Sequence, residues 1–600
     1  MSNASQTVDY SARLAALRKW LRINKLAGFI VPRQDEFQGE YVAAYAERLL
    51  WLTGFSGSWG VAVAGLRKAA IFVDGRYTIQ VRQQVNVKLF EPLHLVDEPP
   101  AMWIGKNLKK GERLGFDPWL VTVDQAKRYA EACEKAGAKL VPVARNPIDI
   151  LWDEQPARPT SKFSSQPTQF AGRSAREKRV DMTKTMAKAN VDAIVLTQPD
   201  SVAWVFNIRG HDVPYTPVAL AYAILHRGAK AELFAGKARL PEDVAAQLKA
   251  VAIIKPPESI SDSLRALGKR KAKVQIDPVW APDFIRAKLA AAGARISNAT
   301  DPCTFPKAAK NQVEREGARA AHRRDGAAMC RFLCWLENAS FGPGLNEFAV
   351  AEKLGEFREA SGELLDLSFG AIAGAGPNAA IPHYHVTRKS SLALEKDGIF
   401  LIDSGGQYQD GTTDITRTVV MGEPTPEMKD RFTRVLKGMI GVSLIRFPKG
   451  TCGSQIDVLA RAALWKAGLD YDHGTGHGVG SYLSVHEGPA RINKIDRTAL
   501  APGMILSNEP GFYKAGHYGI RIENLLLVTE AEDIKGGERP MHGFETLTLC
   551  PIDRRLIDTR LLTREELHWL DAYHARVLDE IGLLLSGQDL EWLKRACGAM

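Results

Sequence analysis

The chain has 600 residues, more than one hydrophobic core usually holds, so we expect roughly two to four domains. Hydrophobic residues make up 45% and charged residues 25%, as in ordinary globular proteins. The sequence contains no run of about 18 apolar residues, so we expect no membrane span. The net charge of +10 comes from 79 basic and 69 acidic residues that are interleaved along the chain, which disfavours nucleic-acid binding.

Cysteine usage and the first residues bear on the compartment. Seven cysteines are scattered without a CxxC pair, which disfavours a disulfide framework and favours a reducing environment. The segment 1–10 is polar and lacks the apolar core of a signal peptide. We therefore expect a cytoplasmic protein.

The first domain is expected at residues 1–150, where amphipathic helical patterns alternate with short apolar runs. The runs Gly28–Val31 and Ala70–Val73 are β-rich and bounded by turn residues, which predicts strands of an α/β layer. The stretch 145–174 is rich in Pro, Ser and Gln and predicts a linker.

The second domain, expected at residues 151–306, repeats the pattern of the first. The segment 26–35 (LAGFIVPRQD) is echoed by 191–200 (VDAIVLTQPD), and 71–75 (IFVDG) is echoed by 232–236 (ELFAG). The order and spacing of these echoes agree, so a tandem duplication is the economical interpretation. A chance similarity of two α/β domains is the alternative.

The third domain, expected at residues 307–600, holds ten of the thirteen histidines, so we expect the chemistry here. Apolar residues at helical spacing predict helices at about 312–339, 347–361 and 427–445, the second of them capped by Asn346. Strand patterns alternate with these helices.

Two acids of this domain come at β-rich runs. Asp403 ends the apolar run 399–402 and a glycine turn follows, while Asp414 belongs to the β-branched run 413–420. The two acids are predicted to face each other across a hairpin. They would repel strongly there unless a cation lay between them.

Three further segments complete a set of metal-ligand types. The segment 473–480 (HGTGHGVG) places His477 between glycines that let the backbone approach a ligand closely. Glu509, in the segment 507–511 (SNEPG), ends the apolar run that begins with 504–506 (MIL), and Glu523 lies in an alternating strand pattern. Singly, each residue could be a cap, a turn or a packed side chain. Together, four carboxylates and one imidazole suit two divalent ions.

The order of these residues, with the HGTGHGVG and SNEPG contexts, resembles the pita-bread metallopeptidases. Within them the chain resembles the long, three-domain form of aminopeptidase P (Xaa-Pro aminopeptidase). The resemblance implies a mixed α/β and α+β architecture, with two tandem creatinase-like domains before a pita-bread catalytic domain. It also implies a homodimeric metalloaminopeptidase that releases the N-terminal residue from peptides with proline in the second position.

The resemblance implies a role for each candidate metal ligand. Asp403 is expected to bind one metal ion, and His477 and Glu509 the other. Asp414 and Glu523 are expected to bridge the two ions, which are expected to be Mn²⁺, with Co²⁺ or Zn²⁺ as alternatives. A hydroxide shared by the ions would attack the Xaa-Pro bond while Glu509 relays its proton.

The resemblance also implies substrate-binding residues. His383, His473 and His486 match positions near the substrate, beside His477, and His383 or His486 would polarise the scissile carbonyl. Arg76 matches an arginine that reaches the substrate region from an N-terminal domain. Trp59 stands where a small residue is usual, which leaves the shape of the subsites open.

Four alternatives share this fold. A prolidase-like dipeptidase and a methionine aminopeptidase carry one such N-terminal domain or none, so the duplication counts against both. A creatinase-like hydrolase and a non-catalytic interaction protein lack the ligand set, so the presence of all five residues counts against them. The expected partners are peptides, with no nucleic acid and no membrane.

Overall fold

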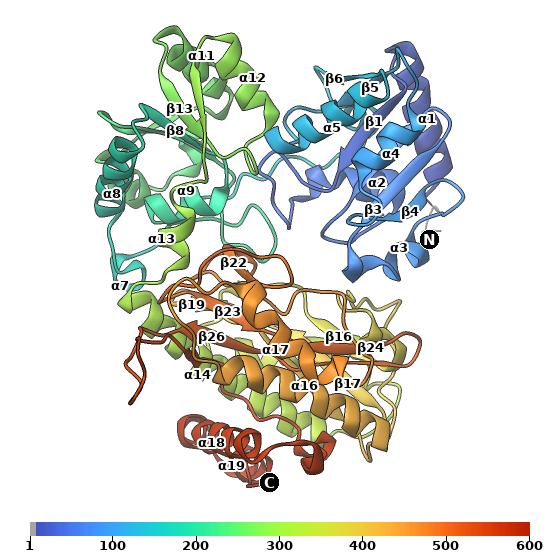
Figure 1. Cartoon of the computed structure of the whole chain (residues 1–600), viewed down its shortest axis with the longest axis vertical. Helices are drawn as coiled ribbons and strands as arrows, with labels where there is room; N and C mark the ends of the chain where they lie inside the picture. The colour runs from blue at the N-terminus through green and yellow to red at the C-terminus, as the bar shows by residue number, and fades with distance from the viewer. Residues whose placement is uncertain (1–7) are drawn as a thin grey trace. The chain divides into compact units, whose positions relative to one another are not determined.

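The computed structural model of the chain describes residues 8–600, so most of the polar segment at 1–10 lies outside the described part. The chain divides into two compact units. The first comprises the residues up to Ser165 together with Arg173–Cys303, and the second comprises Gln166–Gly172 together with Thr304–Met600. Figure 1 labels the elements and colours them along the chain.

The first unit contains two six-stranded sheets of the same topology. The strand orders are β4-β3-β2-β1-β5-β6 and β12-β11-β10-β8-β13-β14. The strands of the first sheet are β1 (Gly28–Pro32), β2 (Val61–Gly65), β3 (Ala69–Val73), β4 (Glu91–His94), β5 (Arg113–Phe116) and β6 (Lys139–Pro142). Those of the second are β8 (Ala193–Leu196), β10 (Tyr222–His226), β11 (Ala231–Phe234), β12 (Ala252–Lys255), β13 (Lys273–Ile276) and β14 (Arg295–Asn298).

The correspondence of the two sheets confirms the predicted duplication. β1 pairs antiparallel with β2 and parallel with β5, and β8 pairs antiparallel with β10 and parallel with β13. β1 and β8 are the strands of the echoed segments 26–35 and 191–200. β3 and β11 are likewise the strands of the second echo.

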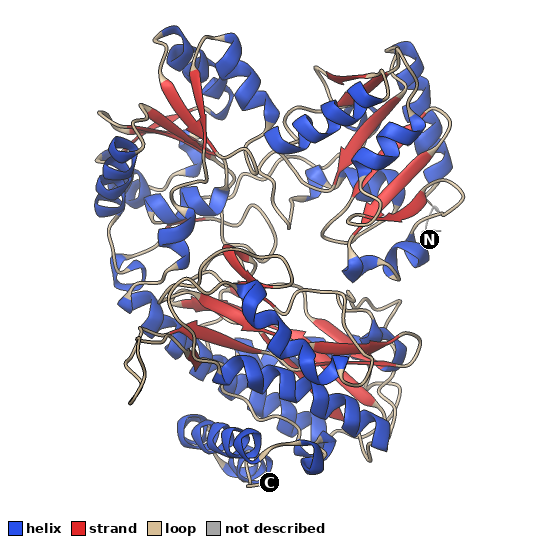
Figure 2. Ribbon diagram, in the orientation of Figure 1, coloured by secondary structure: helices blue, strands red, loops and turns tan. Residues whose placement is uncertain are grey.

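Helices cover the sheets of the first unit, as the blue ribbons beside the red strands in Figure 2 show. On β1, Phe29 and Val31 pack into one hydrophobic cluster and Ile30 into another, so both faces of the strand are buried. The longer helices are α1 (Tyr10–Ile23), α2 (Arg48–Thr53), α4 (Pro100–Asn107), α5 (Val123–Lys135), α8 (Ala175–Lys188), α9 (Pro199–Phe206), α10 (Glu242–Lys249), α11 (Ile260–Lys269) and α12 (Asp283–Ala291).

The stretch 145–174, predicted as a linker, is partly regular. It contains α6 (Pro147–Leu151), β7 (Ser164–Ser165) and α7 (Thr168–Ala171), and β7 pairs with β9 (Ile208–Arg209). Ile148 of α6 is fully buried in the core beside β1. The apolar residues of α6 therefore pack onto the first sheet, which the Pro-rich composition of the stretch did not predict.

The second unit combines helices with several smaller sheets. Its helices are α13 (Thr304–Ala308), α14 (Gln312–Glu337), α15 (Glu347–Glu359), α16 (Pro426–Leu444), α17 (Gly453–Trp465), α18 (Arg564–Ile581) and α19 (Gly587–Ala596). Its strands are β15 (Asp366–Leu367), β16 (Ile372–Ala375), β17 (Ile399–Ser404), β18 (Gly406–Tyr408), β19 (Gly411–Thr412), β20 (Ile415–Val420), β21 (Gly476–Gly478), β22 (Glu487–Ile492), β23 (Ile505–Asn508), β24 (Gly511–Lys514), β25 (Tyr518–Arg521), β26 (Asn524–Val528) and β27 (Phe544–Thr546).

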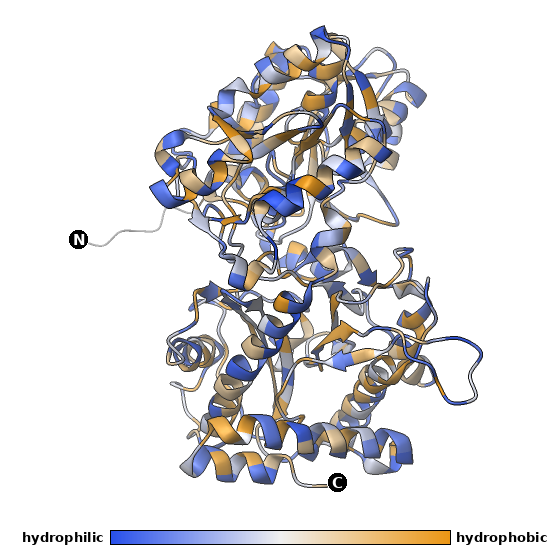
Figure 3. Ribbon diagram, turned by 90° about the vertical axis from the view of Figure 1, so that its left-hand side faces the viewer, coloured by the Kyte–Doolittle hydropathy of each residue, from blue (hydrophilic) through white to orange (hydrophobic). Residues whose placement is uncertain are grey.

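The three helices predicted here agree with α14, α15 and α16 to within two residues at each end. The predicted cap of α15 is present, since the Ala349 N–H donates to Asn346 Oδ1 at 3.1 Å. Figure 3 shows hydrophobic and hydrophilic residues mixed along the helix ribbons, as expected of helices with one buried face.

Two sheets position the candidate site. One has the order β16-β17-β20, and the other has the order β22-β21-β23-β26-β27. β17 and β20 pair antiparallel, as predicted, but Thr416 lies opposite Asp403, so the prediction that Asp414 faces Asp403 directly across the hairpin was wrong. The connection between them is more than a turn, because it folds into its own hairpin of β18 and β19.

Candidate metal centre

Two of the five predicted ligands lie within strands, and the other three directly flank strands. Asp403 is the second-last residue of β17, and Asp414 directly precedes β20. His477 is the middle residue of β21, whereas Glu509 directly follows β23 and Glu523 directly precedes β26. Residues far apart in the sequence are thus brought to one region of the second unit.

Three of these side chains converge closely. One ligand atom each of Asp414, His477 and Glu523 lies within 4.8 Å of the other two. His477 Nε2 lies 3.5 Å from Asp414 Oδ2 and also 3.5 Å from Glu509 Oε1. These separations exceed a good hydrogen bond. Two ligand atoms bound about 2.1 Å from one ion at 90–110° would lie about 3.0–3.4 Å apart, close to what is seen.

The surroundings of His477 orient its ring. Nδ1 lies 3.0 Å from the Gly478 carbonyl oxygen, which can only accept, so Nδ1 donates there and Nε2 is the ring nitrogen that faces the two carboxylates and could bind a metal ion. The backbone N–H of His477 donates to Ser507 Oγ at 3.0 Å. A Cβ on Gly476 would lie 1.9 Å from the Ser507 carbonyl oxygen, so only glycine lets β21 approach β23 this closely.

The acids are buried and incompletely hydrogen-bonded. Asp403, Asp414 and Glu523 are each at most 7% exposed. Asp403 Oδ1 and Glu523 Oε1 are buried without a hydrogen-bond partner among the described residues. Buried carboxylate oxygens are costly unless a cation or donor meets them, so the donor set fits divalent metal ions.

Burial and mutual repulsion disfavour the charged forms of these acids. Burial, followed by the charges of Asp403 and Glu509, holds the pKa of Asp414 well above its ordinary value. Burial and then Asp414 do the same to the pKa of Glu523. Burial also raises the pKa of Glu509, although His477 lowers it. A bound cation would reverse this preference by stabilising the carboxylates.

Arg521 places a positively charged side chain of the protein itself beside these acids. Its Nη2 donates to Asp403 Oδ2 at 2.5 Å and its Nη1 donates to the Tyr513 hydroxyl at 2.7 Å. Its Nε donates to Thr416 Oγ1, which in turn donates to Glu523 Oε2 at 2.7 Å. Burial works against the charge of Arg521, but Tyr513 and Asp403 keep its pKa well above the ordinary value.

No role at the site was predicted for Arg521, Tyr513 or Thr416. A signal for Arg521 was present, because it lies two residues before Glu523 in an alternating pattern, and such residues share a face. Thr416 carries the same signal, because it lies two residues after Asp414 in the β-branched run 413–420. Tyr513 carries no comparable signal, because its contacts arise from strands that pack together in the folded unit.

The histidines predicted near the substrate differ in their contacts. The His486 ring lies 4.3 Å from the His477 ring, centroid to centroid, and at 78° to it. His473 Nε2 lies 2.8 Å from the Tyr513 hydroxyl, and its Nδ1 lies 2.8 Å from the Gly474 carbonyl oxygen. His383 lies in the half-buried loop after the 3₁₀ helix Gly376–Ala380.

Arg76 belongs to the first unit. It pairs there with Asp74 at 2.8 Å and with Glu40 at 3.5 Å. Burial opposes its charge, but Tyr77 and Asp74 outweigh that effect and raise the pKa of Arg76. Its predicted role toward a substrate stays a prediction.

Comparison with protein families agrees with the three-part organisation. Residues 316–530 match the metallopeptidase family M24, and residues 540–600 match the C-terminal region of that peptidase family. Residues 13–149 and 154–314 each match a creatinase/prolidase N-terminal domain.

Several relatives match the whole chain. A probable Xaa-Pro aminopeptidase P of Paracoccidioides brasiliensis is 40% identical over 98% of this chain and 99% of its own length. A probable Xaa-Pro aminopeptidase P of Coccidioides posadasii is 38% identical over 99% of this chain and 93% of its own length.

Among solved structures, an X-prolyl aminopeptidase of Caenorhabditis elegans, described as a cytosolic enzyme with a di-nuclear active site, matches with a TM-score of 0.93 and 32% identity. The match covers 99% of this chain and all of that one. A Xaa-Pro dipeptidase of Bacillus anthracis shares the fold over 63% of this chain, with a TM-score of 0.52 and 22% identity.

The fold and the clustered acids define a metal-dependent hydrolase with creatinase-like N-terminal domains. The chain belongs to the metallopeptidase family M24, among the Xaa-Pro aminopeptidase P proteins. The predicted fold is therefore confirmed, and so is the prediction of an enzyme rather than a non-catalytic interaction protein. Within residues 8–600, no helix combines the length and apolar character needed to cross a membrane.

Proposed function

We propose that this enzyme releases the N-terminal residue from peptides whose second residue is proline. The observation that carries the proposal is the close grouping of Asp414, His477 and Glu523 in a chain whose full length matches Xaa-Pro aminopeptidase P proteins. The C. elegans X-prolyl aminopeptidase, which matches nearly the whole chain, is described as having a di-nuclear active site.

Two divalent ions would be held by the clustered side chains. Asp403 would bind one ion, His477 and Glu509 the other, and Asp414 and Glu523 both. The buried oxygens of Asp403 and Glu523 that lack a partner support this assignment. When bound, such a pair of ions activates a water and polarises a carbonyl. Hard oxygen ligands with a single imidazole suit Mn²⁺, with Co²⁺ and Zn²⁺ as alternatives.

Glu509 is the best candidate to carry a proton from the attacking water to the leaving nitrogen. Its carboxylate oxygen Oε1 lies 3.5 Å from His477 Nε2, so it is placed to accept a proton from a water held at this cluster. Its backbone N–H donates to the Thr475 carbonyl oxygen at 2.8 Å, and its Oε1 accepts a hydrogen bond from Ser507 Oγ at 3.1 Å. These two bonds hold the carboxylate beside His477.

The substrate assignments follow from charge and shape. The bond before proline has no N–H, so a site for it must accept a rigid ring rather than read an amide donor. The free amine of the first residue is cationic and would be held by the acids. His383 or His486 would donate to the carbonyl oxygen, His473 would line the site, and Arg76 would contact the substrate from the N-terminal part.

Further features of the proposal rest on the family alone. The domains are proposed at 1–150, 151–306 and 307–600, and a homodimer is proposed because the chain resembles the long form of the family. A cytoplasmic location is proposed because the matching C. elegans protein is described as cytosolic.

A peptide assay tests the activity. We expect Mn²⁺-dependent release of the first residue from an Arg-Pro-Pro peptide and none from an Arg-Ala-Pro peptide. Glu523→Gln should abolish release. Glu530→Gln should not, because Glu530 is 70% exposed and pairs only at the surface with Arg315. Turnover that persists after thorough chelation would refute the proposal.

The same assay separates the dipeptidase alternative. An Arg-Pro dipeptide should be cleaved more slowly than the tripeptide if the chain is an aminopeptidase. Preference for the dipeptide would favour a prolidase-like activity instead.

A further inference from the structure

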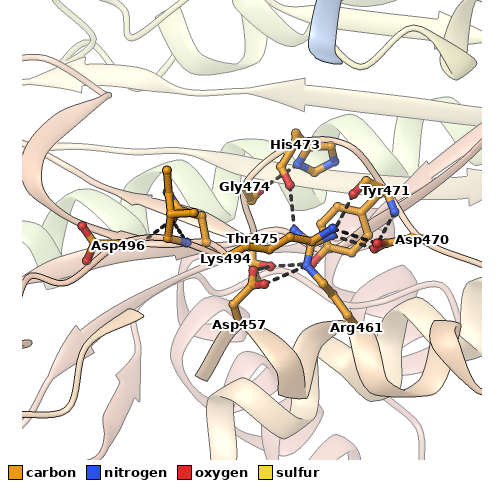
Figure 4. A network of polar contacts seen from close by, with 11 residues as sticks. Asp457, Arg461, Asp470, Tyr471, His473, Gly474, Thr475, Lys494 and Asp496 are labelled. Carbon is orange, nitrogen blue, oxygen red and sulfur yellow. Dashed lines mark hydrogen bonds and ion pairs between the residues drawn. The ribbon is translucent and has the colours of Figure 1, made fainter. Parts of the chain in front are cut away.

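Helix α17 carries a buried ion pair between Arg461 and Asp457, and the remaining hydrogen bonds of Arg461 go to the loop that follows the helix. Arg461 is 1% exposed, and its Nε donates to Asp457 Oδ2 at 2.8 Å, one helical turn earlier. Its Nη1 donates to Asp470 Oδ1 and to the Tyr471 carbonyl oxygen, both at 2.7 Å, and its Nη2 donates to the His473 carbonyl oxygen at 2.9 Å. Figure 4 shows the loop segment 470–475 gathered around this guanidinium.

The same two side chains also contact the Tyr471 ring and Thr475, the last residue of the loop segment. The Arg461 guanidinium lies 3.9 Å from the centroid of the Tyr471 ring, a cation–π contact. Thr475 Oγ1 donates to Asp457 Oδ1 at 2.5 Å and lies 2.5 Å from the Tyr471 hydroxyl. Both ends of segment 470–475 are therefore tied to two side chains of one helix.

This segment has no helix or strand of its own and leads directly into β21. It carries His473, which contacts the Tyr513 hydroxyl, and it ends two residues before His477. Its Thr475 carbonyl oxygen also accepts the backbone N–H of Glu509 at 2.8 Å. A shift of the segment would therefore displace two candidate metal ligands together.

An ion pair buried this deeply adds little net stability over apolar side chains of similar size, so the geometry it imposes is its main contribution. Arginine suits this task because its planar fork fixes several acceptors at once, which the single ammonium of lysine does not.

We propose that Arg461 and Asp457 are positioning residues that fix segment 470–475, and through it His477 and Glu509, in the geometry that binds metal. The assignment rests on the proposed function for its catalytic consequence. The structural consequence stands independently, because it concerns the loop itself.

Hydrogen exchange on the metal-free protein tests the structural consequence. Arg461→Lys should increase exchange of peptides spanning 470–478 by about tenfold, with α16 unchanged. The matched control is Arg434→Lys. Arg434 also pairs with an acid one turn earlier, Asp430, and donates to the Ala463 carbonyl oxygen, but it is 24% exposed and holds no candidate ligand.

Metal binding and steady-state kinetics test the functional consequence. Arg461→Lys should weaken Mn²⁺ affinity and lower kcat at saturating metal by about ten- to a hundredfold, with KM within about threefold, because supporting residues of metal ligands act on this scale. Asp457→Asn should act in the same direction. The control should stay within about twofold.

Thr475→Val keeps the proposal testable if Arg461→Lys does not fold, because it only removes the hydroxyl shared by Asp457 and Tyr471. Unchanged exchange in 470–478 and unchanged Mn²⁺ affinity in a folded variant would overturn the proposal. If the wild-type protein shows no metal-dependent cleavage, the proposed function fails, and the exchange data still decide whether the pair positions the loop.

Discussion

The loop that carries His383 depends on one buried carboxylate, and Glu347→Gln is the sharpest test of that dependence. Glu347 is fully buried at the start of α15. Its Oε1 accepts from the Ala375 N–H at 2.6 Å, while its Oε2 accepts from the Leu392 N–H at 2.9 Å and from the Tyr384 hydroxyl at 3.0 Å. These bonds span the loop on both sides of His383.

Asn378 Nδ2 is a fourth donor, 3.0 Å from Oε2, and the expected cost follows from counting these donors. Glutamine has one acceptor oxygen, so either the Ala375 or the Leu392 N–H would face an NH₂ group and lose its acceptor, at about 1–3 kcal/mol. The remaining bonds would lose their charge assistance, at about 0.5–1 kcal/mol each. Tyr384 can still donate to Ser390, so its loss is small. We expect a total of about 2–4 kcal/mol.

Calorimetry and kinetics measure the two consequences. The unfolding transition of the second unit should move to lower temperature in Glu347→Gln. The value of kcat on an Arg-Pro-Pro peptide should fall by about ten- to a hundredfold, because displacement of a catalytic group by about 1 Å costs on this scale. Bound metal should stay near the wild-type amount, since Glu347 contacts none of the candidate ligands.

Glu352 on the same helix provides the matched control. It is 55% exposed and its ion pair with Arg388 spans 3.6 Å, so Glu352→Gln should change stability by less than about 0.5 kcal/mol. If Glu347→Gln behaved like Glu352→Gln in both assays, the carboxylate would not organise the loop and the reasoning would be wrong.

Two predictions concern pH. Because burial and neighbouring acids raise the pKa of Asp414, its contribution to the stability of the metal-free protein is present below pH about 4 and is lost as the pH rises. The Asp414→Asn variant should therefore melt at a higher temperature than the wild type in chelator at pH 8, although it should bind no Mn²⁺. A lower melting temperature would contradict this. Burial and then Glu36 raise the pKa of Asp35 to about 7, so stability should fall between pH about 4 and 7, by at most about 4 kcal/mol. Asp35→Asn keeps an acceptor for the N–H groups of Phe37 and Gly39 and should flatten that fall in pH-dependent denaturation; an unchanged slope would count against it.

Strands and helix ends were predicted well where a few neighbouring residues determine them. The continuous apolar run at 28–31 became a strand with both faces buried, and Asn346 capped its helix as its side chain dictates. The duplication was also readable, because repeated modules repeat their turn and strand signals. Composition misled at 145–174, where a few apolar residues among prolines were enough to form α6.

The sequence by itself determined which chemical groups the chain offers and which strands carry them, since turn residues and side-chain periodicity act over a few positions. Only the tertiary structure decided that β17, β20, β21, β23 and β26 bring those groups together, that Arg521 meets Asp403, and that Arg461 holds the loop before His477. Residues this far apart in the chain meet through the packing of sheets and helices, and the cost of burying their charges together is set by that packing rather than by their spacing.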